Sequence, residues 1–402
     1  MRTRRPGGSA AGGGVERPAA GLRVLALEPY YGGSHRGFID GWIRHSAHEW
    51  DLHTLPARKW KWRMRHSALT FAEAVEERVG AGDSWDVVFC SDMVNLAELL
   101  ALAPRPVGAL PAVVYFHENQ LTYPVRFPKE RDYQFGLTNV TSALAAREVW
   151  FNSAFHRGEL LAAIPRFLKA MPDHRPWGVV ARIRERSRVM HPATGPIARR
   201  RGRRAPGPLR VVWAARWEFD KAPEVLFEAA RRLAEGGVDY RLSVLGERFA
   251  DAPPVFAAAR ERLGDRIERW GPLERREDYV AALQAADVFV STAIHEFFGL
   301  AAVEAIAAGA YPLVPERLAY PEVLELDEHP ERQEHFYDGS ADGLAKRLAQ
   351  LAAALEGTSP SLAEKAACLR PRMASFFWPR AAPQLDAALA AAAGRKAGSE
   401  LE

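Results

Sequence analysis

Short runs of apolar residues alternate with amphipathic stretches along most of the chain. Apolar runs of about 4–8 residues are typical of buried strands, and amphipathic stretches with a helical period are typical of helices. The runs predict strands at Leu22–Leu27, His48–Leu55, Asp86–Cys90, Ala112–Phe116, Leu209–Ala214, Tyr240–Leu245 and Asp287–Ser291. Helices are predicted at His35–His45, with Ser34 as its cap, and at Pro223–Ala234, Phe298–Ala308 and Ser375–Ala393. This alternation indicates an α/β fold with parallel sheets.

The segment Ala193–Pro208 interrupts the alternation and divides the chain. It holds three prolines and a run of five arginines, with no hydrophobic period, so we expect a linker. We predict two doubly wound, Rossmann-like domains that face a central cleft, where ligands bind at the carboxyl ends of the strands. The expected segments are domains over residues 21–192 and 209–374, a linker over 193–208, a helix over 375–393 that can cross back to the first domain, and a tail over 394–402.

Composition excludes several classes of protein. The 402 residues include two cysteines, Cys90 and Cys368, which excludes a disulfide scaffold and favours a reducing, cytoplasmic compartment. Residues 1–20 lack an apolar core, so we expect a disordered leader and not a secretory signal. No apolar run reaches the roughly 18 residues of a membrane span, so no membrane partner is expected. The net charge of +4 does not by itself indicate a nucleic-acid partner.

Candidate chemistry concentrates after two predicted strands of the second half. Glu296 and Glu304 stand eight positions apart in the stretch HEFFGLAAVE, which on a helix would bring both carboxylates to one face. Gly299 permits close backbone approach, and the N–H groups at a helix start attract an anion such as a pyrophosphate. Arg216 and Lys221 can bracket a diphosphate. Taken singly, the first motif also fits a capped helix with incidental acids, and the second fits a solvated loop.

This combination of residues resembles the family 4 retaining glycosyltransferases of GT-B fold. The resemblance implies that Arg216 and Lys221 contact the diphosphate of a sugar-nucleotide donor. It also implies that Glu304 contacts the donor ribose and that Glu296 lies near the sugar hydroxyls. The backbone positions that it implies at the phosphates are Phe298, Gly299 and Leu300.

Four segments of the first half carry more specific patterns. They are LEPYYGGSH at residues 27–35, LPARKWKWR at 55–63, FHENQLTYP at 116–124 and FNS at 151–153. These segments are similar to the tRNA-queuosine α-mannosyltransferase family, and the resemblance spans residues 22–322. It implies GDP-mannose as the donor and the cyclopentenediol of queuosine, at the anticodon wobble position of tRNA-Asp, as the acceptor. The Arg-rich linker and the leader depart from the family pattern, but neither touches these motifs. The composition is typical of a bacterial protein, which leaves the identities of the donor and the tRNA open.

Polar residues follow the predicted strands of the first half. We expect Gly32 and Gly33 to let the donor approach the backbone, although a glycine pair also suits a plain tight turn. His117 can contact the sugar or act on an acceptor proton, or it can be a structural histidine. The residues that we expect at the acceptor are His35, Asp92, Glu118, Asn119 and Gln120, and Asp92 suits a helix cap at least as well.

Residues 59–66, KWKWRMRH, interleave four fixed cations with two tryptophans. Cations attract phosphates, and aromatic rings stack on the splayed bases of an anticodon loop. We therefore predict an RNA-binding loop formed by Lys59, Trp60, Lys61, Trp62 and Arg63, with Arg126, Lys129 and Arg131 as a possible extension. A surface helix with one buried tryptophan face is the alternative.

No protein nucleophile is evident, so the expected catalysis depends on stabilising the leaving diphosphate. The expected catalytic residues are Glu296, His117, Arg216 and Lys221. No Asp-x-Asp motif follows a predicted strand, so we expect no cofactor and metal-independent activity. Two other hypotheses stay open: a family 4 glycosyltransferase with a lipid or polysaccharide acceptor, and a non-catalytic RNA-binding protein on a GT-B scaffold.

Overall fold

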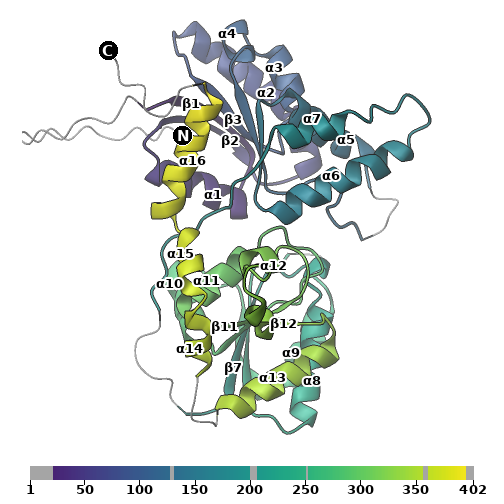
Figure 1. Cartoon of the computed structure of the whole chain (residues 1–402), viewed down its shortest axis with the longest axis vertical. Coiled ribbons are helices and arrows are strands. Elements are labelled where there is room, and N and C mark those ends of the chain that lie inside the picture. The colour runs from purple at the N-terminus through teal and green to yellow at the C-terminus, as the bar shows by residue number, and fades with distance from the viewer. Residues whose placement is uncertain (1–20, 127–130, 200–205, 250–251, 356–360, 395–402) are drawn as a thin grey trace, which may run out of the picture.

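The computed structural model describes residues 21–126, 131–199, 206–249, 252–355 and 361–394. They form two α/β domains, which lie one above the other in Figure 1. Each domain is built on a six-stranded sheet whose strands are all parallel, so the predicted α/β fold with two doubly wound domains is confirmed. Within the described residues, no helix combines the length and the apolar character needed to cross a membrane.

The first sheet has the strand order β2-β1-β3-β4-β5-β6. Its strands are β1 (Arg23–Tyr31), β2 (Glu49–Pro56), β3 (Val87–Ser91), β4 (Ala112–Phe116), β5 (Glu148–Phe151) and β6 (Ser187–Val189). Its helices are α1 (Gly33–His45), α2 (Trp60–Gly80), α3 (Leu96–Leu102), α4 (Arg105–Gly108), α5 (Tyr133–Ala145), α6 (Ala154–Lys169) and α7 (Val179–Glu185). The order reverses between β1 and β3, where the strand ends can open a ligand crevice.

The second sheet has the order β12-β11-β10-β7-β8-β9 and reverses between β7 and β10. Its strands are β7 (Leu209–Ala214), β8 (Tyr240–Leu245), β9 (Ile267–Gly271), β10 (Val288–Val290), β11 (Tyr311–Pro315) and β12 (Phe336–Tyr337). The α-helices are α8 (Pro223–Glu235), α9 (Val255–Leu263), α10 (Arg276–Ala285), α11 (Leu300–Ala308), α12 (Tyr320–Val323), α13 (Ala341–Leu355), α14 (Leu362–Ala367), α15 (Arg370–Ser375) and α16 (Trp378–Ala392), and the 3₁₀ turns are η2 (Phe219–Lys221), η3 (Gly264–Arg266) and η4 (Pro330–His335).

Alternate residues of the inner strands enter cores on opposite faces of each sheet. In β1, Leu25 and Leu27 pack in the same core as Phe71 of α2, whereas Val24 packs with Trp42 of α1. Burial on both faces explains why these strands are continuous apolar runs in the sequence and do not alternate with polar residues.

The last helix, α16, packs on the first domain although it follows the second in sequence. Figure 1 shows it, in yellow, beside α1 of the upper domain. Asp386 of α16 accepts hydrogen bonds from Trp42 Nε1, the Ser46 hydroxyl and the Ala47 amide, each at 2.7 Å. Trp378 and Leu385 enter the same core as Trp42. The chain therefore crosses between the domains twice.

The structure corrects several expected boundaries. Helix α1 begins at Gly33 after an extended Gly32, with no side-chain cap, so Ser34 is not the capping residue. The predicted helix Ser375–Ala393 corresponds to α16, which begins three residues later, at Trp378, because Ser375 is the last residue of α15. Of the arginine run in the linker, residues 200–205 lie outside the described residues, whereas Thr194 pairs with Phe377 in an isolated parallel bridge.

We predict that Asp386→Ala lowers the free energy of unfolding by about 3 kcal/mol, because three donors around a buried carboxylate lose their acceptor. The midpoint of urea denaturation measures this change. Asp239→Ala is the matched control, since Asp239 makes an exposed pair with Arg241 at 3.0 Å and its removal should cost under about 0.5 kcal/mol. An equal midpoint for the two variants would contradict the tie between α16 and the first domain.

Candidate active site

A pocket opens at the carboxyl ends of β7 and β10, where the second sheet reverses its strand order. Its wall includes Lys221, Ser291, Glu296, Gly299 and Tyr320. Lys221 follows β7, and Ser291 and Glu296 follow β10, whereas Gly299 and Tyr320 stand at the starts of α11 and α12. They lie close together because β7 and β10 are neighbouring parallel strands and end at the same edge of the sheet. The sequence prediction of a site at these strand ends therefore agrees with the location of the pocket.

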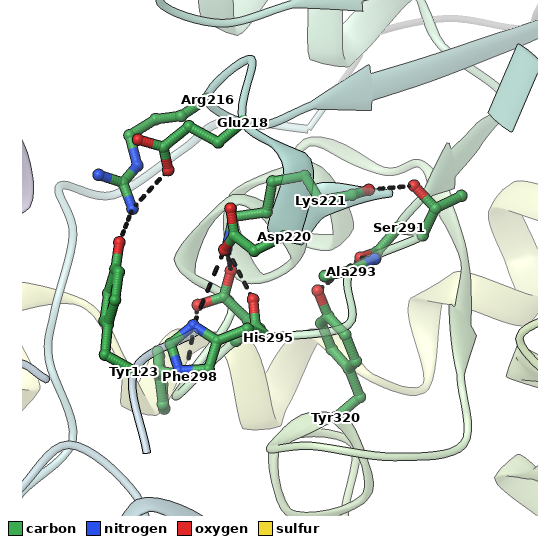
Figure 2. Close-up of polar contacts among 12 residues, drawn as sticks. Tyr123, Arg216, Glu218, Asp220, Lys221, Ser291, Ala293, His295, Phe298 and Tyr320 are labelled. Atoms are coloured by element: carbon green, nitrogen blue, oxygen red, sulfur yellow. Dashed lines mark hydrogen bonds and ion pairs between the residues drawn. The ribbon is translucent and has the colours of Figure 1, made fainter. Parts of the chain in front are cut away.

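Lys221 is a buried cation in the wall of this pocket. Its Nζ donates a hydrogen bond to the His295 carbonyl at 2.7 Å and lies 3.1 Å from Asp220 Oδ2 and 3.4 Å from Glu296 Oε2 (Figure 2). The turn that carries the lysine is held by the sheet edge, because Thr292 Oγ1 donates to the Lys221 carbonyl at 2.6 Å. A buried ammonium is tolerated here because carboxylates and a carbonyl replace its water.

The charges of this cluster stabilise one another. Burial lowers the pKa of Lys221, but Glu296 and Asp220 outweigh burial and raise it above its ordinary value. Burial raises the pKa of Glu296, but Lys221 and His295 hold it below the ordinary value of a glutamate. Burial also opposes the charge of Asp220, yet His295 and Lys221 lower its pKa to about 2. All three groups are therefore charged at neutral pH, and the lysine is a permanent cation for an anionic ligand.

Arg216 reaches from the second domain to the first. Its guanidinium lies 3.1 Å from Glu218 Oε2 and donates to the Tyr123 hydroxyl at 3.3 Å (Figure 2). Tyr123 belongs to the FHENQLTYP segment, and its ring also meets the ring of His295 edge-on, with 5.0 Å between the centroids. The Arg216 side chain is half exposed, so its guanidinium stays open to a ligand between the domains.

The start of α11 offers unused backbone donors to the same pocket. Its N-cap residue, Gly299, has a φ of +95°, and no side chain caps the helix. A Cβ at Gly299 would lie 2.8 Å from the Tyr320 ring, so glycine is required here. Phe298 contributes only its backbone, because its ring is buried in the core. The amides of Ala302 and Val303 donate to the Gly299 carbonyl at 2.9 and 3.2 Å, so the N–H groups of Leu300 and Ala301 are the uncapped ones. Uncapped N–H groups beside a cation such as Lys221 suit an anion.

The two glutamates do not share a helix face, and our expectation on this point was wrong. Glu296 precedes α11, whereas Glu304 lies within it. The buried Glu304 carboxylate accepts hydrogen bonds from the Thr194 hydroxyl at 2.7 Å and from Arg276 of α10 at 2.5 Å. A ribose hydroxyl at Glu304 would therefore share this carboxylate with a linker residue and an arginine.

The first domain presents two stacked histidines at the ends of its strands. The rings of His35 and His117 lie 4.1 Å apart, centroid to centroid, with 34° between their planes. His35 Nδ1 lies 3.1 Å from Glu28 Oε2. Burial lowers the pKa of His35, but the Glu28 carboxylate outweighs burial and raises it to about 9. His35 is therefore a buried imidazolium at neutral pH.

His117 is held through its backbone and leaves its ring available. Its N–H donates to Asp92 Oδ1 at 2.8 Å, and its carbonyl accepts from Asn152 Nδ2 at 2.9 Å. Neither ring nitrogen has a hydrogen-bond partner among the described residues. Burial and the charges of His35 and His156 hold the pKa of His117 well below its ordinary value. The ring is therefore a neutral group that can accept a hydrogen bond.

Two residues that we expected at the acceptor are buried and cannot touch a ligand in this conformation. Asp92 is 0% exposed and orients the His117 amide, while Asn95, not Asp92, caps α3. Asn119 is 0% exposed, and its Oδ1 accepts the amides of Leu121 and Thr122 at 3.1 and 2.9 Å. Both side chains build the turn that carries His117, and the pattern of polar residues after a strand could not separate this role from ligand contact.

The rest of the FHENQLTYP turn is also internally bonded. Gln120 Nε2 donates to Glu118 Oε1 at 3.0 Å, and the Glu118 side chain is half-buried. Arg131, expected on an RNA track, instead donates to the carbonyls of Gln120, Leu121 and Tyr123. Lys129 lies outside the described residues, and Arg126 has partners of its own.

The glycine pair after β1 has a local reason. A Cβ at Gly32 would lie 2.5 Å from Ala57 Cβ, so the loop after β2 packs directly on this residue. Gly33 has a φ of +50° and open space where its side chain would be. The space beside Gly33 leaves room for a ligand, and its contact with the donor stays a prediction.

Glu28, His35 and His117 are the described residues whose donor atoms, all within 4.8 Å of one another, could hold a metal ion. Two imidazoles and a carboxylate suit a divalent transition metal. Here, however, His35 Nδ1 already bonds to Glu28 Oε2 at 3.1 Å, and the two rings are tilted at 34° to each other. We therefore describe the group as an ion pair with a stacked neighbour, and metal-independent activity stays a prediction.

The cationic stretch after β2 is helical and not a loop, as we had expected, because α2 begins at Trp60. The Trp60 ring packs on the ring of Phe135 of α5, with 5.1 Å between the centroids, and Lys61 Nζ lies 5.6 Å from the centroid of the Trp60 ring. Trp62 is 62% exposed and stacks on His66 at 4.9 Å. The remaining two expected residues are Lys59, which is the N-cap of α2, and Arg63, which donates to the Pro56 carbonyl and contacts His66. One tryptophan is therefore structural, and one is open.

Contacts between the domains include residues that the sequence did not single out. The Ser153 hydroxyl donates to the Phe297 carbonyl at 2.5 Å, and the His156 ring stacks on the Phe297 ring at 3.7 Å. Glu322 of α12 accepts the amides of Ala154 and Phe155, at the start of α6, at 2.9 and 3.0 Å. The FNS segment supplied the signal for Ser153, but no pattern pointed to Glu322.

Known proteins match both halves of the chain. Residues 23–194 match the family model for the N-terminal domain of tRNA-queuosine alpha-mannosyltransferase, and residues 196–357 match glycosyl transferases group 1. A tRNA-queuosine alpha-mannosyltransferase of Drosophila melanogaster is 37% identical over 336 residues, which are 81% of this chain and 85% of that protein. A GDP-mannose-dependent alpha-(1-6)-phosphatidylinositol dimannoside mannosyltransferase of Mycobacterium tuberculosis is 28% identical over 47% of this chain and 45% of that protein.

Solved structures share the fold. The catalytic domain of starch synthase IV from Arabidopsis thaliana, bound to ADP and acarbose, has a TM-score of 0.69 at 13% identity and covers 94% of this chain and 100% of that one. Sucrose-phosphate synthase from Thermosynechococcus elongatus has a TM-score of 0.66 at 16% identity, with 90% and 97% coverage. These likenesses show the two-domain GT-B fold. Given the N-terminal family match and the 37% identity to the Drosophila protein, the chain belongs to the tRNA-queuosine α-mannosyltransferase family.

Proposed function

We propose that this chain transfers mannose from GDP-mannose to the cyclopentenediol of queuosine in tRNA-Asp, with retention at the anomeric carbon. The observation that carries the proposal is the pocket where Lys221 and the uncapped start of α11 converge, with Arg216 directly after Ala215 of its wall. The charged lysine and the uncapped helix start suit a diphosphate, and the family match in the first domain supports queuosine as the acceptor. The two free cysteines support a reducing, cytoplasmic location.

In the proposed reaction, the bond from mannose C1 to the diphosphate breaks while an acceptor hydroxyl oxygen bonds to C1 on the same face. The hydroxyl proton passes to a phosphate oxygen, and GDP leaves. Arg216, Lys221 and the amides from Gly299 onward stabilise the charge that develops on the diphosphate. Glu296 lies at the lysine and is placed to bind sugar hydroxyls. His117 offers a neutral ring nitrogen to a sugar or acceptor hydroxyl.

On the acceptor side, the exposed Trp62 with Lys61 and Arg65 forms a basic aromatic surface at the start of α2. Phosphates and unstacked bases of an anticodon loop suit such a surface. The same surface also suits a membrane headgroup region, which keeps a lipid acceptor as the second candidate function.

The transfer itself is tested by incubating the protein with GDP-mannose and queuosine-containing tRNA-Asp and measuring the mass of the modified nucleoside. We expect a gain of one hexose. UDP-glucose and tRNA-Asp without queuosine are the controls. If mannose is not transferred to the tRNA but is transferred from GDP-mannose to a lipid-linked acceptor, the proposal is contradicted and the second candidate is supported.

We predict that Arg216→Ala lowers kcat about 100-fold, equivalent to about 3 kcal/mol, because one donor to the leaving diphosphate is lost. The melting temperature should stay unchanged, since this side chain is half exposed. Lys221→Ala should also abolish transfer, but it leaves buried carboxylates without a partner, so Arg216 is the sharper test. Arg275→Ala, which removes an exposed pair with Asp278 in the same domain, is the control. Equal rates for the Arg216 and Arg275 variants would refute the assigned role.

We predict that Trp62→Ala raises the Kd for tRNA about tenfold, because base stacking contributes about 1–3 kcal/mol. Lys61→Glu should weaken tRNA binding and reduce its salt dependence, with the affinity for GDP-mannose unchanged. Filter binding at several salt concentrations measures both effects. Trp177→Ala, at another exposed tryptophan of the first domain, is the matched control. Loss of vesicle flotation without loss of tRNA affinity would favour the lipid acceptor.

A further inference from the structure

Glu28 has no part in the reaction as described so far, yet it is among the most completely bonded carboxylates of the first domain. It is 4% exposed at the end of β1. Its Oε1 accepts the Tyr30 amide at 2.8 Å and the Ser91 hydroxyl at 3.1 Å, and its Oε2 contacts His35 Nδ1 at 3.1 Å. A buried carboxylate with three partners has one orientation, so the ring of His35 has one orientation as well.

The position of the His117 ring depends on His35. The two rings are stacked at 4.1 Å, and Phe38 and Tyr115 contact the His117 ring from other sides, at 5.2 and 4.7 Å. The His117 backbone is held at both its amide and its carbonyl. The side chain therefore lies among Phe38, Tyr115 and His35, and of these three His35 is the charged one.

We propose that Glu28 is a positioning residue, which through its ion pair with His35 fixes the neighbouring ring of His117 in its orientation toward the substrate hydroxyl. A positive charge against one face of the His117 ring opposes a second proton there. A neutral imidazole can accept a hydrogen bond from a hydroxyl, whereas an imidazolium cannot. The contact between His117 and the substrate rests on the proposed function, but the charge on His35 does not.

The charged groups around the pair are few. His35 faces Glu28 from β1, Asp92 after β3, and Glu118 after β4. His117 faces His35 of α1 and His156 of α6. Asp92 and Glu118 also favour the charge on His35, but Glu28 acts most strongly and is the residue in direct contact. Its removal is therefore the change that should release the proton.

The charge is tested directly by ¹⁵N NMR of the histidine rings in the full chain, with signals assigned from His35→Gln and His117→Gln. In the wild type, we expect His35 to stay protonated at about pH 7.5 and to titrate with a pKa of about 9, while His117 stays neutral. In Glu28→Gln, which keeps the shape of the side chain, His35 should be neutral at about pH 7.5. A neutral His35 in the wild type would overturn the proposal, whatever the behaviour of Glu28→Gln. One equivalent of bound metal in the purified protein would overturn it as well.

The consequence for the reaction is tested by the pH profile of kcat/KM. Activity of the wild type should fall as the pH rises through about 9, because His35 then loses its proton and with it the ion pair to Glu28 that fixes the two rings. In Glu28→Gln, the fall of kcat/KM on the alkaline side should move below about pH 7. At about pH 7.5, kcat/KM should therefore be about tenfold or more below that of the wild type. The difference between the two proteins should shrink as the pH falls. Asp40→Asn, which removes the exposed pair with Arg36 on the same helix, should keep the wild-type profile.

Two outcomes separate this proposal from its alternatives. A Glu28→Gln variant that loses activity equally at every pH, with a lower melting temperature, would mean that Glu28 is only structural. Transfer that fails in the wild type, while the NMR titration shows a charged His35, would refute the proposed function and leave the ion pair standing.

Discussion

The hydrogen bond from the Ser153 hydroxyl to the Phe297 carbonyl joins the two domains where their strand ends face each other. The same oxygen caps α6, since it accepts the His156 amide at 2.9 Å. One side chain thus sets the start of a helix in the first domain and the path of the HEFFGLAAVE segment in the second. The pocket geometry depends on that path, because Glu296 and Gly299 flank Phe297 and its neighbour along the chain.

The two sides of the cleft differ in their electrostatics. In the second domain, Lys221 and Arg216 are held by carboxylates and remain cationic. This suits a diphosphate, whose negative charge increases when its bond to the sugar breaks. In the first domain, one charged histidine lies against one neutral histidine, which suits uncharged hydroxyl groups. This division follows the two proposed substrates, a diphosphate donor on one side and a diol on the other. Tyr123 connects the sides, because it contacts both Arg216 and His295.

Sequence patterns located the pocket more reliably than they assigned its side chains. Arg216, Lys221 and Glu296 were identified from their positions after strands, and the structure gathers them at one sheet edge. Asp92 and Asn119 follow strands in the same way, but they turn inward and hold the backbone of the FHENQLTYP turn. Glu28 lies in the LEPYYGGSH segment at the end of β1, but no pattern showed that its carboxylate faces inward to His35. A polar residue beside a strand end can face either way, and the neighbours that decide are distant in sequence.

The order of strands and helices was determined by the sequence itself, because burial on both faces of a parallel sheet leaves continuous apolar runs that any reading of the chain detects. The same is true of the family, whose motifs are contiguous stretches. Only the tertiary structure decided which polar groups are buried, which helix covers which domain and which histidine is charged. The reason is physical: burial, hydrogen bonding and charge depend on partners such as Trp42 and Asp386, which are 344 positions apart and meet only in the folded chain.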